Sequence, residues 1–170
     1  MNRKNNGNGY SIDDVRYDPV AAYQLACELE RKHKSPRLVQ SLLTRSADQK
    51  YDRALIKLAG RLIRGYYYPD DDLCAAAPVK NEVVGVQRVQ EAVACGCCVA
   101  NYLIARAYLD GIGVEADKMS ADAYLNCITE DTYDAAQFEA QEIMAFGNVS
   151  HELHNMLYSK LNKDKHSGKR

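Results

Sequence analysis

The chain has 170 residues, of which 46% are hydrophobic and 26% are charged, and its formal net charge is −1. A balance so close to neutral provides no overall field that would attract nucleic acid or an anionic membrane. No apolar run approaches the roughly 18 residues of a transmembrane helix, and the first residues lack the apolar stretch of a secretory signal. We therefore expect a cytoplasmic protein that binds neither nucleic acid nor membrane, although export by a dedicated secretion system would leave no such mark.

The two ends of the chain differ in composition from its middle. Residues 1–16 are rich in Asn, Gly and charge, which predicts a disordered N-terminal tail. Residues 162–170 are basic and polar, and we interpret them as a solvated C-terminal tail. Residues 17–161 are expected to fold as one helical domain with an inserted loop near 66–81, a segment that contains two prolines.

Hydrophobic periodicity in the middle of the chain is helical. Apolar residues recur at steps of three and four, and strict alternation is absent, so an all-α fold is predicted. Helix ends are predicted at Gly65, Gly96, Gly111 and Gly147, because glycine readily adopts the left-handed conformation that commonly follows a helix.

One helix pattern occurs four times. Ala100 is followed by an apolar residue, a small residue, Tyr108 and Gly111 at offsets 4, 5, 8 and 11. Looser copies of this pattern begin at Ala21, Ala54 and Ala136, and a second amphipathic segment follows each copy. Periods of this size are typical of stacked helix pairs. The sequence therefore predicts an α-solenoid of about four antiparallel helix pairs.

The clearest copy resembles the Sel1-like repeat, a relative of the tetratricopeptide repeat. The positions that match its pattern are Ala100, Tyr108, Gly111, Gly113, Val114, Asp117, Ala121 and Tyr124, while Ile104 and Ala105 stand where the pattern has Leu and Gly. The resemblance extends over roughly residues 20–161. It implies a right-handed superhelix whose first helices line the inner face. It also implies a non-catalytic adaptor or scaffold, as in bacterial signalling, secretion and host interaction.

A row of cations is the first candidate binding surface. Lys57, Arg61 and Arg64 stand at positions i, i+4 and i+7 of one predicted helix, and Arg106 occupies the corresponding side of the next repeat. On the inner face of a solenoid they would form a basic surface for an acidic segment of a partner protein. The alternative is an ordinary solvated helix face.

Three consecutive tyrosines, Tyr66, Tyr67 and Tyr68, open the inserted loop. They cannot all face inward on a short element, and an exposed Tyr is a common anchor in protein interfaces. We therefore include them in the candidate partner-binding surface. The alternative is a loop that folds back onto the stack.

Three cysteines gather at a predicted turn, at Cys95, Cys97 and Cys98. Thiols so close together could serve a hydrolase or a metal or redox enzyme, with Cys74 or Cys127 as a fourth zinc ligand. The paired C-x-x-C spacing of zinc sites is absent, however, and a helical-repeat turn requires small residues. We therefore interpret the thiols as packing groups and predict neither catalysis nor a cofactor.

The remaining hypothesis is a structural subunit of a larger assembly. A short solenoid leaves apolar surface at both ends of the stack, and self-association would cover it. The sequence does not discriminate between this hypothesis and an adaptor that binds a different protein.

Overall fold

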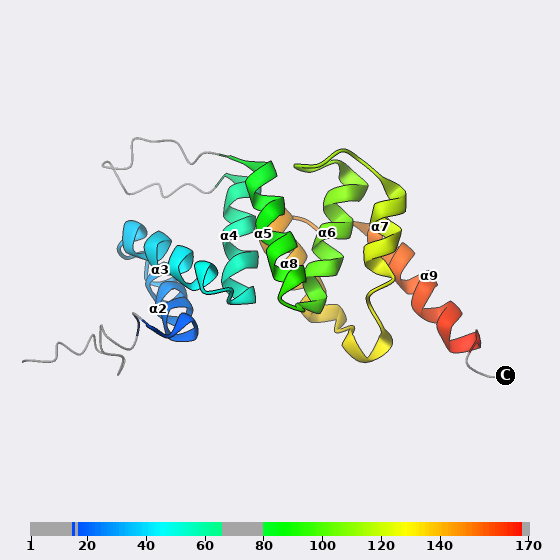
Figure 1. Ribbon diagram of the computed structural model, residues 1–170, viewed down its shortest axis with the longest axis horizontal. Coiled ribbons are helices and arrows are strands. Elements are labelled where there is room, and N and C mark those ends of the chain that lie inside the picture. The colour runs from blue at the N-terminus through cyan, green and yellow to red at the C-terminus, as the bar shows by residue number, and fades with distance from the viewer. Residues whose placement is uncertain (1–14, 16, 66–79, 168–170) are drawn as a thin grey trace, which may run out of the picture.

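The computed structural model describes residue 15, residues 17–65 and residues 80–167, and this part of the chain is helical without a strand. The helices are α2 (Pro19–Arg31), α3 (Pro36–Asp48), α4 (Asp52–Arg64), α5 (Glu82–Ala94), α6 (Cys98–Asp110), α7 (Lys118–Leu125), α8 (Ala135–Phe146) and α9 (His151–Ser167), with a 3₁₀ turn at Glu130–Thr132. They form an elongated stack of helix pairs, with α2 and α3 at one end and α9 at the other (Figure 1). The predicted all-α solenoid is confirmed.

The helices begin and end at residues with specific capping chemistry. The carboxylate of Asp18 accepts hydrogen bonds from the backbone N–H groups of Val20 and Ala21, which satisfies donors at the start of α2. Asn81, Asp117 and Asp134 cap α5, α7 and α8 in the same way. The predicted helix ends are also confirmed, since Gly65, Gly111 and Gly147 follow α4, α6 and α8 with positive φ, and Gly96 lies one residue beyond the cap of α5.

Small residues allow the helices to approach each other closely. A Cβ atom placed on Gly85 of α5 would lie 2.6 Å from Cγ1 of Ile63 on α4. A Cβ atom on Gly60 of α4 would lie 2.5 Å from the backbone oxygen of Met144 on α8. Real Cβ atoms do not tolerate such contacts, so glycine is required where α4 meets each of these helices.

Helix α8, the first helix of the fourth repeat, packs against both α4 and α6. In Figure 1 it lies behind α5, where it contacts α4 and α6. Its buried residues are Phe138, Glu142 and Ala145. The fourth copy of the sequence pattern therefore predicts the helix end at Gly147 correctly but not the buried face of α8, because Ala136 and Ala140 are exposed.

The best-matching repeat is formed by α6 and α7. Tyr108 of α6 and Tyr124 of α7 stack with their ring centroids 5.8 Å apart. The turn that joins the two helices places Gly113 against the start of α5, where a Cβ atom would lie 2.4 Å from the backbone oxygen of Glu82. Two residues that carried the family resemblance thus join the helices of one repeat, and a third joins that repeat to its neighbour.

The observed element boundaries differ from the expected ones at both tails. Val15 is helical, 5% exposed and part of a cluster with Ala22, Ala26, Val39, Leu42 and Leu43, so ordered structure begins before residue 17. At the other end α9 continues to Ser167, through much of the expected tail at 162–170. Of the inserted loop at 66–81, the structure describes Lys80 and Asn81. Within the described ranges, no helix is long and apolar enough to cross a membrane.

Candidate partner-binding surface

Lys57 and Arg61 project from α4 toward α2, where they share one carboxylate. The Nζ atom of Lys57 lies 2.6 Å from Oε2 of Glu30, and Nη2 of Arg61 lies 2.7 Å from Oε1 of the same residue. Arg61 also donates to Oε1 of Gln40 on α3 at 2.8 Å. The side chains of Lys57 and Arg61 are 17% and 6% exposed. These two cations therefore join the first helix pair to the second.

The shared carboxylate, Glu30, is held in its charged form. Partial burial would raise its pKa, but hydrogen bonds and charge interactions with Lys57 and Arg61 outweigh burial and lower it below the ordinary value. Sequence analysis missed Glu30. The available signal was its place in the last two residues of α2, the first helix of the pair that precedes the two cations at i, i+4 spacing on α4.

Arg106 is also engaged within the chain. Its guanidinium donates to Asp110 on the same helix, to Glu142 on α8, and at 3.2 Å to Oδ1 of Asn148. The guanidinium carbon lies 5.4 Å from the centroid of the Phe146 ring. Burial alone would lower the pKa of Arg106, but the hydrogen bonds to the two carboxylates raise it. Arg106 therefore joins α6 to α8 and to the turn beyond it.

Glu142 is the centre of this junction and is fully buried. Besides Arg106, it accepts a hydrogen bond at 3.0 Å from the hydroxyl of Tyr102 and one at 2.9 Å from the backbone N–H of Ser150. Burial, together with the Glu142 charge, raises the pKa of Tyr102, so the phenol keeps the proton that it donates. The sequence signal was the position of Glu142, four residues after Phe138 and three before Ala145 on a single helical stripe.

Most of the cations that were predicted to form an exposed row are instead engaged in ion pairs within the chain. Of the four cations, Arg64 is exposed, while Arg61 and Arg106 are buried and Lys57 is partly covered. Arg64 ends α4, and its Cδ atom would lie 3.4 Å from a Cβ atom on Gly147, in the turn after α8. Arg64 and Arg106 therefore both border this turn, whereas Lys57 and Arg61 face α2. Tyr66, Tyr67 and Tyr68 lie outside the described residues.

The cysteine cluster occupies the turn between α5 and α6. Cys95 is exposed, and Cys97 and Cys98 are partly buried. Burial raises the pKa of the Cys97 thiol to about 11, which disfavours the thiolate that a nucleophile or a zinc ligand requires. Within the described residues no group of three or more His, Cys, Asp or Glu side chains is arranged to hold a metal ion. Cys74 lies outside those residues.

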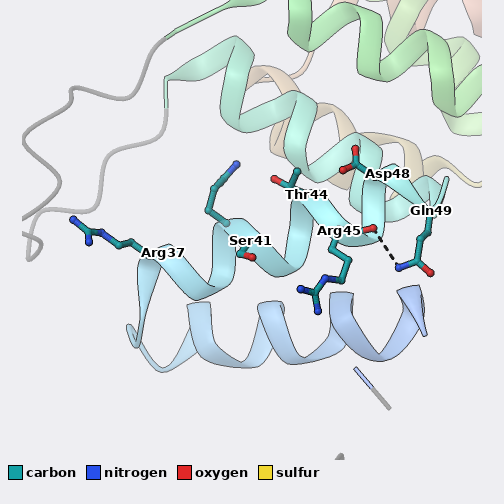
Figure 2. Close-up of a pocket in the computed structure, with 7 residues that line it drawn as sticks. Arg37, Ser41, Thr44, Arg45, Asp48 and Gln49 are labelled. Atoms are coloured by element: carbon teal, nitrogen blue, oxygen red, sulfur yellow. Dashed lines mark hydrogen bonds between the residues drawn. The ribbon is translucent and has the colours of Figure 1, made fainter. Parts of the chain in front are cut away.

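A hollow on α3 is a surface feature that sequence analysis did not identify. Polar side chains from one face of this helix line it, namely Arg37, Gln40, Ser41, Thr44, Arg45 and Asp48, with Gln49 at its end. Figure 2 shows Arg37 at one end of the row and Asp48 and Gln49 at the other. The available signal was a helix whose polar residues recur at steps of three and four along one face.

Together, the helix pairs, the glycine contacts and the inter-repeat ion pairs define a helical solenoid. The fold is that of a Sel1 repeat protein. The chain is similar to the crystal structure of a Sel1 repeat protein from Oxalobacter formigenes, with a TM-score of 0.58 and 18% sequence identity over 86% of this chain and 93% of that chain. No protein-family model matches the sequence, and no curated protein matches it. The resemblance found from Ala100 to Tyr124 is confirmed at the level of the fold.

Proposed function

We propose that this chain is a non-catalytic cytoplasmic adaptor, a scaffold that holds another protein against its helical stack. The observation that carries this proposal is the fold, since the Sel1 repeat fold is generally a protein-interaction scaffold. The charges at the repeat junctions support it, because Glu30 and Glu142 bind cations of this same chain and so specify which helices meet in the stack. A stack of helical repeats presents an extended surface that is well suited to recognition.

One proposed contact surface lies at the C-terminal end of α4. Arg64 is exposed there, and the chain continues into Tyr66, Tyr67 and Tyr68. An acidic group of a partner would gain a charge-assisted, bidentate hydrogen bond from Arg64. Lys57, Arg61 and Arg106 would support this surface indirectly, by fixing α4 against α2 and α6 against α8.

The test is capture of a partner followed by reconstitution. A protein retained by the folded chain in its host is purified, and its affinity is measured by titration calorimetry against wild type, Arg64→Glu and Arg53→Glu. Arg53 is an exposed cation near the opposite end of the same helix, so it controls for charge. We expect a saturable complex that Arg64→Glu weakens and Arg53→Glu does not. If no purified protein binds the folded chain, the adaptor proposal is wrong.

The same complex discriminates the adaptor from a thiol-dependent enzyme. The raised pKa of Cys97 motivates the expectation that its thiol is inert at neutral pH. A triple variant with Ala at Cys95, Cys97 and Cys98 should keep the affinity for the partner. The wild-type protein, purified without chelator, should hold no stoichiometric zinc when its metal content is measured. Stoichiometric zinc or rapid alkylation of Cys97 at pH 7 would favour the enzyme.

A structural subunit of an assembly is a second candidate. Large apolar side chains are exposed on the second helices of the third and fourth repeats. Met119 of α7 is 82% exposed, and Tyr158 of α9 is 55% exposed. A second copy or a neighbouring subunit could cover them. Light scattering after size exclusion, at concentrations from micromolar to millimolar, should show a discrete oligomer that Tyr158→Glu dissociates. A monomer throughout this range would contradict self-association.

A further inference from the structure

The turn between α2 and α3 carries a dense run of positive charge. Arg31, Lys32, Lys34 and Arg37 lie within seven residues, together with His33, and all five side chains are exposed. No acidic residue occurs between residue 31 and residue 47. The whole chain has a net charge of −1, so this positive charge is a local feature of one turn. We refer to residues 31–37 as the basic turn.

The basic turn is continuous with the hollow on α3. Arg37 belongs to both, and Arg45 lies two helical turns further along the same face, as Figure 2 shows. Between the two arginines the hollow presents the amide of Gln40 and the hydroxyls of Ser41 and Thr44. These groups can donate hydrogen bonds to carboxylate and backbone carbonyl oxygens. Charge and hydrogen-bond donors therefore lie along a single line.

At the Asp48 end of the hollow, the negative charge is neutralised by a cation of the same chain. Oδ1 of Asp48 lies 3.8 Å from Nη1 of Arg88 on α5, so the negative charge of Asp48 already faces a cation. In the basic turn, Lys32 pairs with Glu28 of α2. By sequence, the positive side chains of this surface are concentrated toward the Arg37 end, where Arg31, Lys32 and Lys34 also lie. A ligand that follows the hollow would place its acidic groups there.

The dimensions favour an extended peptide. From Arg37 to Gln49 the helix rises about 18 Å, at 1.5 Å per residue. An extended chain advances about 3.3 Å per residue, so five or six residues span this distance. None of the residues that line the hollow is aromatic. Bases of a single-stranded nucleic acid would therefore find no side chain to stack on, and stacking is a main source of affinity in such sites.

We propose that the basic turn and the α3 hollow together bind an extended acidic segment of a partner protein. This proposal rests on the adaptor function and assigns it a second surface, on α3 and the turn before it. Steering by the cations of the turn brings the segment to the stack, and hydrogen bonds in the hollow fix its register.

The experiment measures binding of a fluorescein-labelled hexaglutamate peptide by fluorescence anisotropy at low and moderate salt. Wild type is compared with Arg37→Glu/Arg45→Glu, and with the charge-matched control Lys118→Glu/Lys163→Glu on α7 and α9. A second variant, Ser41→Tyr, fills the hollow without changing the charge, and Ala123→Tyr on the exposed side of α7 is its control. Circular dichroism and thermal melting show that each variant is folded.

We expect saturable hexaglutamate binding that the Arg37→Glu/Arg45→Glu pair weakens at least about 10-fold, a loss of roughly 1.4 kcal/mol. Ser41→Tyr should also weaken binding severalfold, while both controls bind as wild type does. Equal loss in the two charge variants, or no effect of Ser41→Tyr, would show diffuse attraction and overturn the proposal. Tighter binding of a decathymidylate than of hexaglutamate would overturn it in favour of a nucleic-acid surface.

Failure of the α3 binding surface can be distinguished from failure of the proposed adaptor function. If the captured partner binds Arg37→Glu/Arg45→Glu as tightly as wild type, the adaptor stands and the α3 surface is wrong. If no partner binds the folded chain, the adaptor is wrong, whatever the peptide measurement gives. Partner binding that is lost with this pair and retained with Lys118→Glu/Lys163→Glu supports both.

Discussion

At the residue scale, the described part of the chain places buried and partly buried charges at the junctions between helix pairs. Glu142 and Arg106 lie at the junction of α6 and α8, and Glu30 and Arg61 at the junction of α2 and α4. A buried ion pair adds little net stability when compared with apolar side chains, but it strongly penalises any arrangement that separates its members. We infer that these pairs specify which helices meet. The sequence showed the cations but not their partners, because a glutamate on a helix is usually solvated.

The first prediction concerns Glu142. In Glu142→Ala, Arg106 loses a buried carboxylate and keeps Asp110, while the Tyr102 hydroxyl and the Ser150 N–H lose their acceptor. We expect the free energy of unfolding to fall by about 3 kcal/mol, as when one member of a buried pair is removed. Urea denaturation measures it. Glu139→Ala, an exposed position on the same helix, should change stability by less than about 0.5 kcal/mol, and equal effects would contradict the proposed role.

The second prediction concerns acid stability and Glu30. Its pKa is lower in the folded chain than in the unfolded chain, so between the two pKa values the unfolded state binds more protons. The stabilisation is present above the ordinary pKa of 4.5 and is lost as pH falls through the lower folded pKa. Urea denaturation from pH 7 to pH 3 should show a smaller loss of stability in Glu30→Gln than in wild type. Parallel curves would show that Glu30 does not contribute.

At the element scale, helix ends and helix pairing were predictable, whereas the buried face of α8 was not. Ala54, Ala59, Ala100 and Ala105 are fully buried, as their recurrence in the pattern predicts. In α8 the same offsets select the exposed Ala136 and Ala140, because this helix packs through Phe138 and Ala145 against two helices at once. A local pattern contains no information about which distant helix will be the neighbour. The α3 hollow could not be predicted from the sequence for a related reason. A row of polar residues on a helix has the same sequence pattern whether or not it borders a depression.

The third prediction concerns Gly60, where α4 meets α8. Ala has a higher helix propensity than Gly by about 1 kcal/mol, so an exposed Gly→Ala change in a helix stabilises. At Gly60 the added Cβ would lie 2.5 Å from a backbone oxygen and 3.0 Å from the Ala145 Cα, neither of which can rotate away. We expect Gly60→Ala to destabilise by about 1–3 kcal/mol despite its propensity. Thermal melting tests this, and a raised melting temperature would show that α8 does not approach α4 so closely.

At the scale of the whole molecule, α9 closes one end of the stack. Leu153, Leu157 and Leu161 of this helix are buried. Nζ of Lys160 donates at 2.8 Å to the backbone oxygen of Leu125, the last residue of α7, and at 2.8 Å to that of Ile128. Its remaining described side chains are mostly exposed or partly exposed. One apolar stripe on an otherwise polar helix is what a terminal cap requires, because the solenoid would otherwise end in apolar surface.

The fourth prediction follows from this cap. A chain that ends at Ser150 loses the three leucines and should expose apolar surface of α6, which binds a hydrophobic dye and favours aggregation. A chain that ends at Asn162 keeps all three and should remain monodisperse in light scattering if wild type is. Similar dye binding by both truncated chains would contradict the capping role of α9.

The contact between α4 and α8 joins the second helix pair directly to the first helix of the fourth, in addition to the contact that α8 makes with α6 of the third pair. In a regular solenoid each repeat touches only its neighbours, so repeats can unfold one after another from an end. Here α8 cannot detach without uncovering Gly60 in the second pair, and α4 is also bound to α2 through Glu30. The stack therefore has a contact between repeats that are not neighbours in the sequence, and its unfolding should be a single cooperative transition. For a protein that must present surfaces at both ends to one partner, this contact would keep their spacing fixed.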